Sequence, residues 1–67
     1  MGLNERQIKA IMYVKERGKI TNKEYREINL VSNKTAFFEL SDLVSKGFLK
    51  EEGKGKNTYY VMKVIER

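Results

Sequence analysis

The chain has 67 residues, of which 40% are hydrophobic and 34% are charged, a size and composition that suit one small soluble domain rather than a disordered or membrane-spanning segment. The absence of cysteine and histidine excludes a disulfide framework, a thiolate nucleophile and the usual zinc site. The formal net charge of +5 favours nucleic acid, an acidic protein or anionic lipid as the partner.

The first predicted helix covers residues 5–17. Asn4 and Gln7 have the spacing of a capping box, and Gly18 suits the left-handed position that follows a helix. Met12 lies off the inward face and is either a harmless exposed residue or part of a contact surface. The inward face repeats at helical spacing and consists of Leu3, Gln7, Ala10, Ile11 and Val14, with Ile8 at its margin.

A shorter helix is predicted over residues 22–28. Thr21 and Glu24 form a second capping box at its start. Asn29 tolerates the left-handed conformation, so we expect this residue to end the helix. The residues expected to face the core are Tyr25 and Ile28.

The third predicted helix begins after Ser32, which is a favourable cap, and ends at Gly47. The second and third helices are joined by a tight turn at Leu30 and Val31, so together they form a helix-turn-helix unit. Such helix pairs also occur in proteins that never bind DNA, so this signal alone is weak. The buried stripe of the third helix consists of Ala36, Leu40, Leu43 and Val44.

A hairpin is predicted after the helices. Residues 48–52 and 58–62 are rich in strand-forming side chains and flank a basic tip at residues 53–57. Ile20 is expected to pair with this hairpin as a third strand. The order of elements predicts an α+β, mostly helical, winged helix-turn-helix with three helices, a small antiparallel sheet and one wing. We expect residues 1–67 to form this single domain, either alone or as a piece of a larger protein.

Five blocks of sequence, spread over almost the whole chain, carry a family resemblance: residues 3–7, 18–25, 31–36, 43–47 and 53–56. In these blocks the chain resembles the small C-terminal winged-helix domain of RecG-like, helicase-related transcriptional regulators, which is related to the DeoR-type reader head. The resemblance implies a double-stranded DNA-binding module of a prokaryotic transcriptional regulator. It places the helix beginning at Asn33 in the major groove, with the wing beside it.

The residue types at these positions suit contacts with a duplex. Asn33 can make a bidentate contact with adenine, although it can equally be a simple helix-start residue, and Lys34 can pair with guanine or with phosphate. Lysines and hydroxyl groups beside the major groove hold the backbone, although the wing lysines can equally be plain solvated charge. The expected DNA contacts are Lys23, Arg26, Asn33, Lys34, Thr35, Phe38, Ser41, Lys54, Lys56 and Asn57.

Four side chains of the third helix fit DNA less well. Glu39 and Asp42 repel phosphate, but they lie on the flank where we expect lysines of the preceding helix to balance them. Phe37 is expected to be partly buried, whereas Phe38 points away from the core and could meet thymine methyl groups, a partner protein or a second copy. In the family that the chain resembles, polar or basic residues usually hold these two positions. A protein-interaction or dimerisation module, binding a homodimer partner or a domain of a parent chain, therefore stays open as the alternative.

Catalysis is not expected. No base is placed to activate a serine or threonine, and the loop at residues 53–58 lacks the spacing of a phosphate-binding loop. We therefore expect no enzyme activity, no cofactor, no small-molecule ligand and no membrane partner. The N-terminus has no basic segment followed by an apolar signal core, so a cytoplasmic location is expected.

Overall fold

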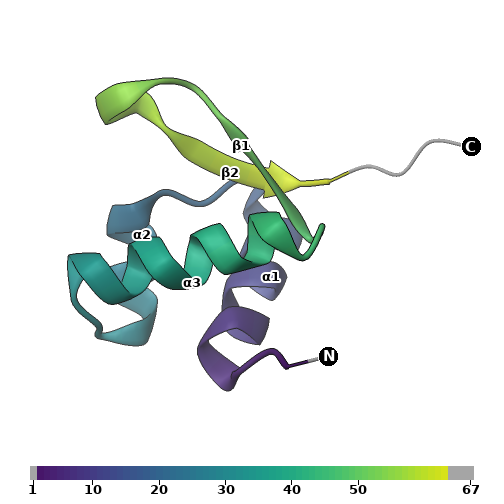
Figure 1. Cartoon of the computed structure of the whole chain (residues 1–67), viewed down its shortest axis with the longest axis vertical. Helices are drawn as coiled ribbons and strands as arrows, with labels where there is room; N and C mark the ends of the chain where they lie inside the picture. Colours follow the sequence, from purple (N-terminus) through teal and green to yellow (C-terminus); the bar gives the residue numbers. More distant parts are fainter. Residues whose placement is uncertain (1, 64–67) are drawn as a thin grey trace, which may run out of the picture.

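The computed structural model describes residues 2–63. Within this range, three helices precede a two-stranded antiparallel hairpin with a short 3-10 helix at its tip. This is the predicted α+β, mostly helical layout of a winged helix (Figure 1). The elements are α1 (Glu5–Arg17), α2 (Asn22–Asn29), α3 (Asn33–Ser45), β1 (Leu49–Glu52), η1 (Gly55–Asn57) and β2 (Tyr59–Met62).

The helix starts follow from the capping residues in the sequence. In α1, Asn4 Oδ1 accepts a hydrogen bond from the Gln7 amide at 2.8 Å, and the Gln7 side chain reaches back to Asn4. In α2, Thr21 and Glu24 form the same reciprocal pair. The hydroxyl of Ser32 caps α3. Each cap satisfies amide groups that have no partner inside the helix, which is why all three predicted starts are confirmed.

The end of α2 differs from the prediction. Asn29 remains helical, and the left-handed residue is Leu30, with φ of 55° and ψ of 51°. The Asn29 side chain donates instead to the Arg6 carbonyl oxygen at 3.3 Å, a contact with α1 that the sequence does not reveal. Leu30 is 90% exposed, so it adopts a conformation that is costly for leucine without gaining burial.

Replacing Leu30 with asparagine is expected to stabilise the domain. Asparagine tolerates left-handed geometry, so the free energy of unfolding should rise by about 1 kcal/mol. For a domain of this size, the Tm should then rise by roughly 4 to 8 °C in thermal unfolding followed by circular dichroism. Leu30→Ala is the matched control, because it removes the same exposed side chain without relieving the backbone. Equal Tm values for the two variants would show that the backbone strain is negligible.

The core lies between the three helices and one face of the hairpin. Its central side chains, Leu40 and Leu43, belong to α3, and they are fully buried together with Tyr25 of α2. Burial of such side chains is the main stabilising contribution in a domain this small. The complete buried apolar set is Ala10, Val14, Ile20, Tyr25, Ala36, Leu40, Leu43, Leu49 and Tyr60.

Backbone hydrogen bonds join the hairpin to the segment between α1 and α2 at the pair formed by Ile20 and Tyr60. Ile20 donates its amide to the Tyr60 carbonyl at 2.9 Å and accepts from the Tyr60 amide at 2.8 Å. The predicted pairing of Ile20 is confirmed, but as a single bridge and not as a strand. In the hairpin itself, Leu49 lies opposite Met62. The residues between these strands extend away from the core as the wing.

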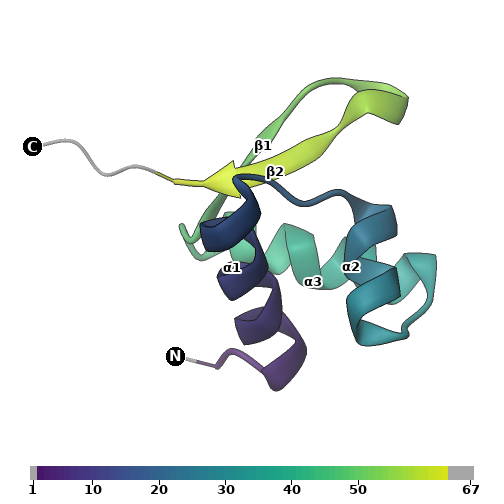
Figure 2. The same cartoon turned by 180° about the vertical axis from the view of Figure 1, so that it is seen from behind.

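The arrangement in space brings the wing and the start of α3 to one end of the molecule. Both views place the wing tip over the end where α2 lies and α3 begins (Figures 1 and 2). The exposed side of α3 and the inner side of the wing therefore border a shared surface. None of the helices in residues 2–63 combines the length and apolar character needed to cross a membrane.

Candidate nucleic-acid interface

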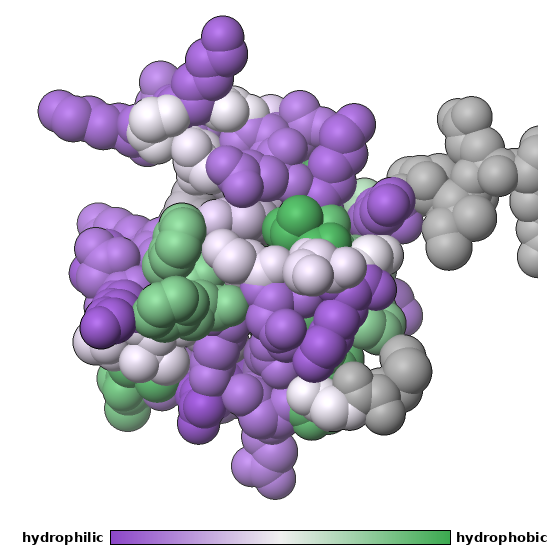
Figure 3. Space-filling model, viewed as in Figure 1, coloured by the Kyte–Doolittle hydropathy of each residue, from purple (hydrophilic) through white to green (hydrophobic). Residues whose placement is uncertain are grey.

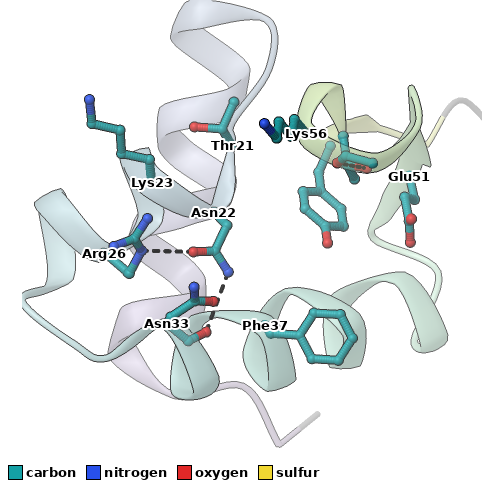
Figure 4. Close-up of a pocket in the computed structure, with 11 residues that line it drawn as sticks. Thr21, Asn22, Lys23, Arg26, Asn33, Phe37, Glu51 and Lys56 are labelled. Atoms are coloured by element: carbon teal, nitrogen blue, oxygen red, sulfur yellow. Dashed lines mark hydrogen bonds between the residues drawn. The ribbon is translucent and has the colours of Figure 1, made fainter.

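A groove of about 680 Å³ separates the wing from α2 and the first turns of α3. Figure 4 shows its helical residues facing those of the hairpin across an open space. Four of the predicted contact residues line it: Lys23 and Arg26 from α2, Asn33 from α3 and Lys56 from the wing. Its other lining residues are Thr21, Asn22, Phe37, Glu51, Gly55, Thr58 and Tyr60.

The remaining predicted residues lie outside this groove. Lys34 and Phe38 are on the exposed face of α3, and Lys54 and Asn57 are exposed at the wing tip. The other two are partly buried. Ser41 lies on α3, and Thr35 accepts a hydrogen bond from the Ser32 hydroxyl at 3.1 Å and is thus part of the helix cap. The structure therefore brings together the cations of α2, Lys56 of the wing and Asn33 of α3, while Thr35 contributes to the cap at the start of the helix.

Phe37 is more exposed than expected. It is 54% exposed and lines the groove, so the prediction of partial burial is wrong. The reason is the position of the wing, which stands away from α3 at this turn and leaves the ring uncovered (Figure 4). Phe38 is 58% exposed, as predicted. The two ring centroids are 6.1 Å apart, and Lys34 Nζ lies 5.9 Å from the centre of the Phe38 ring.

The space-filling view shows how apolar and hydrophilic surface is distributed on the face where α3 lies. Apolar surface lies over α3, with hydrophilic side chains of the wing on one side and of the helices on the other (Figure 3). A basic rim is formed by five side chains: Lys23, Arg26, Lys34, Lys54 and Lys56. Among residues 2–63, the ion pairs are Arg6–Glu39, Lys46–Asp42 and Lys50–Glu52, so none involves a member of the basic rim.

One member of the basic rim is held in place by a neighbouring amide. Arg26 Nε donates to Asn22 Oδ1 at 2.8 Å, and Asn22 Nδ2 donates to the Asn33 carbonyl oxygen at 3.4 Å (Figure 4). These bonds link α2 to the first residue of α3. The Asn22 amide carries no charge, so this hydrogen bond does not offset the positive charge of the guanidinium.

The acidic residues of α3 are neutralised on the opposite flank. Glu39 accepts from Arg6 Nε at 3.0 Å, and it also accepts from the Tyr25 hydroxyl and from Asn4 Nδ2. The hydrogen bond from Arg6 is the main reason that the pKa of the Glu39 carboxyl lies below its usual value. The expected lysines are therefore replaced by an arginine of α1, assisted by Tyr25 and Asn4.

Asp42 is paired within α3 itself. Lys46, one turn later, lies 2.9 Å from its carboxylate, and Gln7 of α1 donates to the same oxygen at 2.9 Å. The contacts with Lys46 and then Gln7 lower the pKa of the Asp42 carboxyl. Both acidic groups of α3 are thus engaged by residues away from the basic rim.

Glu51 is a groove residue that the sequence reasoning missed. It lies opposite Tyr60 in the hairpin, and side chains opposite each other in an antiparallel pair share one face of the sheet. Tyr60 faces the core, so Glu51 faces the helices and places one negative charge in the groove. The strand-forming residues in the sequence predict the hairpin but do not specify this register, which the structure supplies.

The wing tip depends on a glycine at position 53. Gly53 has φ of 79°, and a Cβ atom there would lie 2.2 Å from the Asn57 carbonyl oxygen. The chain can therefore make this tight turn, which carries Lys54 and Lys56, only with glycine at its start.

Neither a comparison with protein-family models nor a search of curated proteins found a match to this chain. Within residues 2–63, acidic side chains do not gather into a group of three that could hold a metal ion. The arrangement of α3, the wing and the basic rim is thus the main structural guide to what the chain does.

Proposed function

We propose that the chain is a double-stranded DNA-binding module of a prokaryotic transcriptional regulator acting in the cytoplasm. The observation that carries this proposal is the basic rim, whose five cations lie on α2, the start of α3 and the wing and have no acidic ion-pair partner in residues 2–63. Unpaired cations beside an exposed helix suit the phosphates that flank the major groove.

In the proposed complex, the N-terminal half of α3 lies in the major groove. Asn33 lies at the first position of the helix, where base edges are within reach of the side chain. Lys34 contacts a base or a phosphate beside it. Lys54, Lys56 and Asn57 follow the backbone on the wing side, while Lys23 and Arg26 follow the backbone on the α2 side.

The test is a fluorescence-anisotropy titration of a labelled duplex at about 50 and 200 mM salt. Neutralising about three to five phosphates predicts a slope of log affinity against log salt near −3 to −5. Lys54→Ala with Lys56→Ala should weaken binding to all sequences alike and make the slope shallower by about two. The matched control is Lys9→Ala with Lys15→Ala, which removes equal charge from α1. Binding that is absent or independent of salt would refute the proposal.

A second candidate function, a protein-interaction module, is favoured by the exposure of Phe37 and Phe38. Met12 of α1 is also 62% exposed. Sedimentation velocity distinguishes this candidate, because a dimer through the aromatic pair should dissociate in the Phe38→Ser variant. A wild-type chain that sediments as a monomer at all concentrations removes the dimer from consideration.

A further inference from the structure

We propose that Phe37 and Phe38 read the C5-methyl groups of thymine, so that the module selects A·T-rich major grooves. This inference rests on the proposed DNA binding and adds a base preference to it. It starts from an observation that DNA binding alone does not explain: two phenylalanine rings are more than half exposed on the helix face that would enter the groove.

The chemistry of the base edges narrows what these rings can recognise. A phenyl ring offers no conventional hydrogen-bond donor or acceptor, and the thymine methyl is the apolar group that a base pair presents in the major groove. Sequence Asn33–Ser45 contains no arginine, so α3 lacks the side chain most suited to bidentate contacts with guanine.

The neighbours of the rings support the same preference. The Asn33 amide can bind adenine, the partner of thymine, because only the backbone carbonyl of Asn33 is hydrogen-bonded in residues 2–63. Lys34 Nζ lies 5.9 Å from the Phe38 ring centre, close enough for a cation–π contact that keeps the ring beside the charge facing phosphate. The 6.1 Å between ring centroids is comparable to two base-pair steps of about 3.4 Å. Thymine methyl groups one or two base pairs apart are therefore within reach of the two phenylalanine rings.

A protein partner fits this surface less well. Two half-exposed phenylalanines offer roughly 200 Å² of apolar area, against the ~800 Å² that each partner buries in a stable interface. Cations of the basic rim line the same groove as Phe37, and Lys34 lies beside Phe38. Covering these cations with an apolar partner would remove them from water without compensation. A polyanion that carries methyl groups meets both requirements.

The experiment compares a short A·T-rich duplex with the same duplex carrying deoxyuridine in place of thymidine, which removes only the C5-methyl groups. Wild-type affinity should fall about tenfold, the effect of losing two buried methyl contacts. Phe38→Ser should bind the thymine duplex more weakly and should show a smaller difference between the two duplexes. Met12→Ser replaces an equally exposed apolar residue on α1 and should keep the full difference. Circular dichroism confirms that each variant is folded.

The outcomes separate the two proposals. Equal, salt-dependent affinity for the thymine and uracil duplexes would overturn the methyl readout and leave DNA binding intact. Absence of binding to either duplex would overturn both. A wild-type dimer that Phe38→Ser dissociates, together with equal affinity for the two duplexes, would assign the rings to a protein contact and overturn the inference.

Discussion

Replacing Lys23, Lys54 and Lys56 with glutamate is expected to abolish duplex binding, with a loss of at least about 100-fold in affinity near 50 mM salt. These lysines come from α2 and the wing, on the two sides of the exposed face of α3, and have no ion pair in residues 2–63. Each substitution removes one favourable phosphate contact and adds a repulsive one. The measurement is the same anisotropy titration, with thermal unfolding to confirm the fold.

A matched variant separates the effect of the net charge from the effect of where the lysines lie on the surface. Changing Lys9, Lys15 and Lys63 to glutamate also takes the formal charge from +5 to −1, because each substitution lowers it by two. These exposed residues do not line the groove, so we expect this variant to lose far less affinity. Equal losses in the two triple variants would contradict a localised interface and indicate a general effect of charge.

The second large effect is expected from Glu39→Gln, which should lower the free energy of unfolding by about 2 kcal/mol at neutral pH, the scale of hydrogen bonds to a charged group. Glu39 binds Arg6 of α1 and Tyr25 of α2, so this carboxylate joins all three helices. For a domain of this size, the Tm should fall by roughly 10 °C. Glu27→Gln, on the exposed side of α2, is the matched control and should leave the Tm almost unchanged.

The hydrogen bonds that Glu39 accepts also predict that the domain loses stability in acid. The pKa of Glu39 is lower in the folded chain than its usual value, chiefly because Arg6 donates to it. A carboxyl of this kind stabilises the fold at pH values above its unfolded pKa of about 4.3, and the contribution disappears as the pH falls through the folded pKa. Wild-type Tm should therefore decline below about pH 5.

The Glu39→Gln variant should show a shallower decline over the same acid range. Some decline should remain, because the pKa of Asp42 is also lowered by Lys46 and Gln7. Thermal unfolding at a series of pH values makes the comparison. If the Tm of the variant and of the wild type decline in parallel, then Glu39 does not carry the expected pH dependence.

The network around Glu39 also links the fold to the proposed interface. An acidic residue on α3 would repel phosphate if it faced the groove, but Arg6 and Tyr25 hold Glu39 on the flank that packs against α1 and α2. This pairing has two effects. It fixes the orientation of α3 in the domain, and it keeps the Glu39 carboxylate away from the basic rim.

Local signals in the sequence were sufficient to predict most of the fold. Asn4, Thr21 and Ser32 are caps whose hydrogen bonds form within a few residues, so the helix starts could be predicted without tertiary information. The buried positions of α3 could also be predicted, because their apolar side chains recur at the spacing of a helix turn. Predictions failed where a choice between neighbours depended on packing, as when Leu30 rather than Asn29 became left-handed.

The candidate site was less predictable because it combines separate elements. The exposure of Phe37 depends on how far the wing stands from α3, which helical periodicity does not specify. The pairing of Glu39 with Arg6 joins residues far apart in sequence, so its partner had to come from the structure. The position of Glu51 likewise depends on the hairpin register that pairs it with Tyr60, which strand propensity alone does not specify.

The most direct test of the proposed interface is chemical-shift mapping of the isotope-labelled chain during titration with duplex DNA. Binding through α3 and the wing predicts that the amide signals of residues 33–41 and 53–58 move together, along with those of Lys23 and Arg26. Signals around Met12 on α1 should stay in place. If the signals of α3 and the wing remain fixed at saturating duplex, or if only those near Met12 move, then the chain does not bind DNA through this surface.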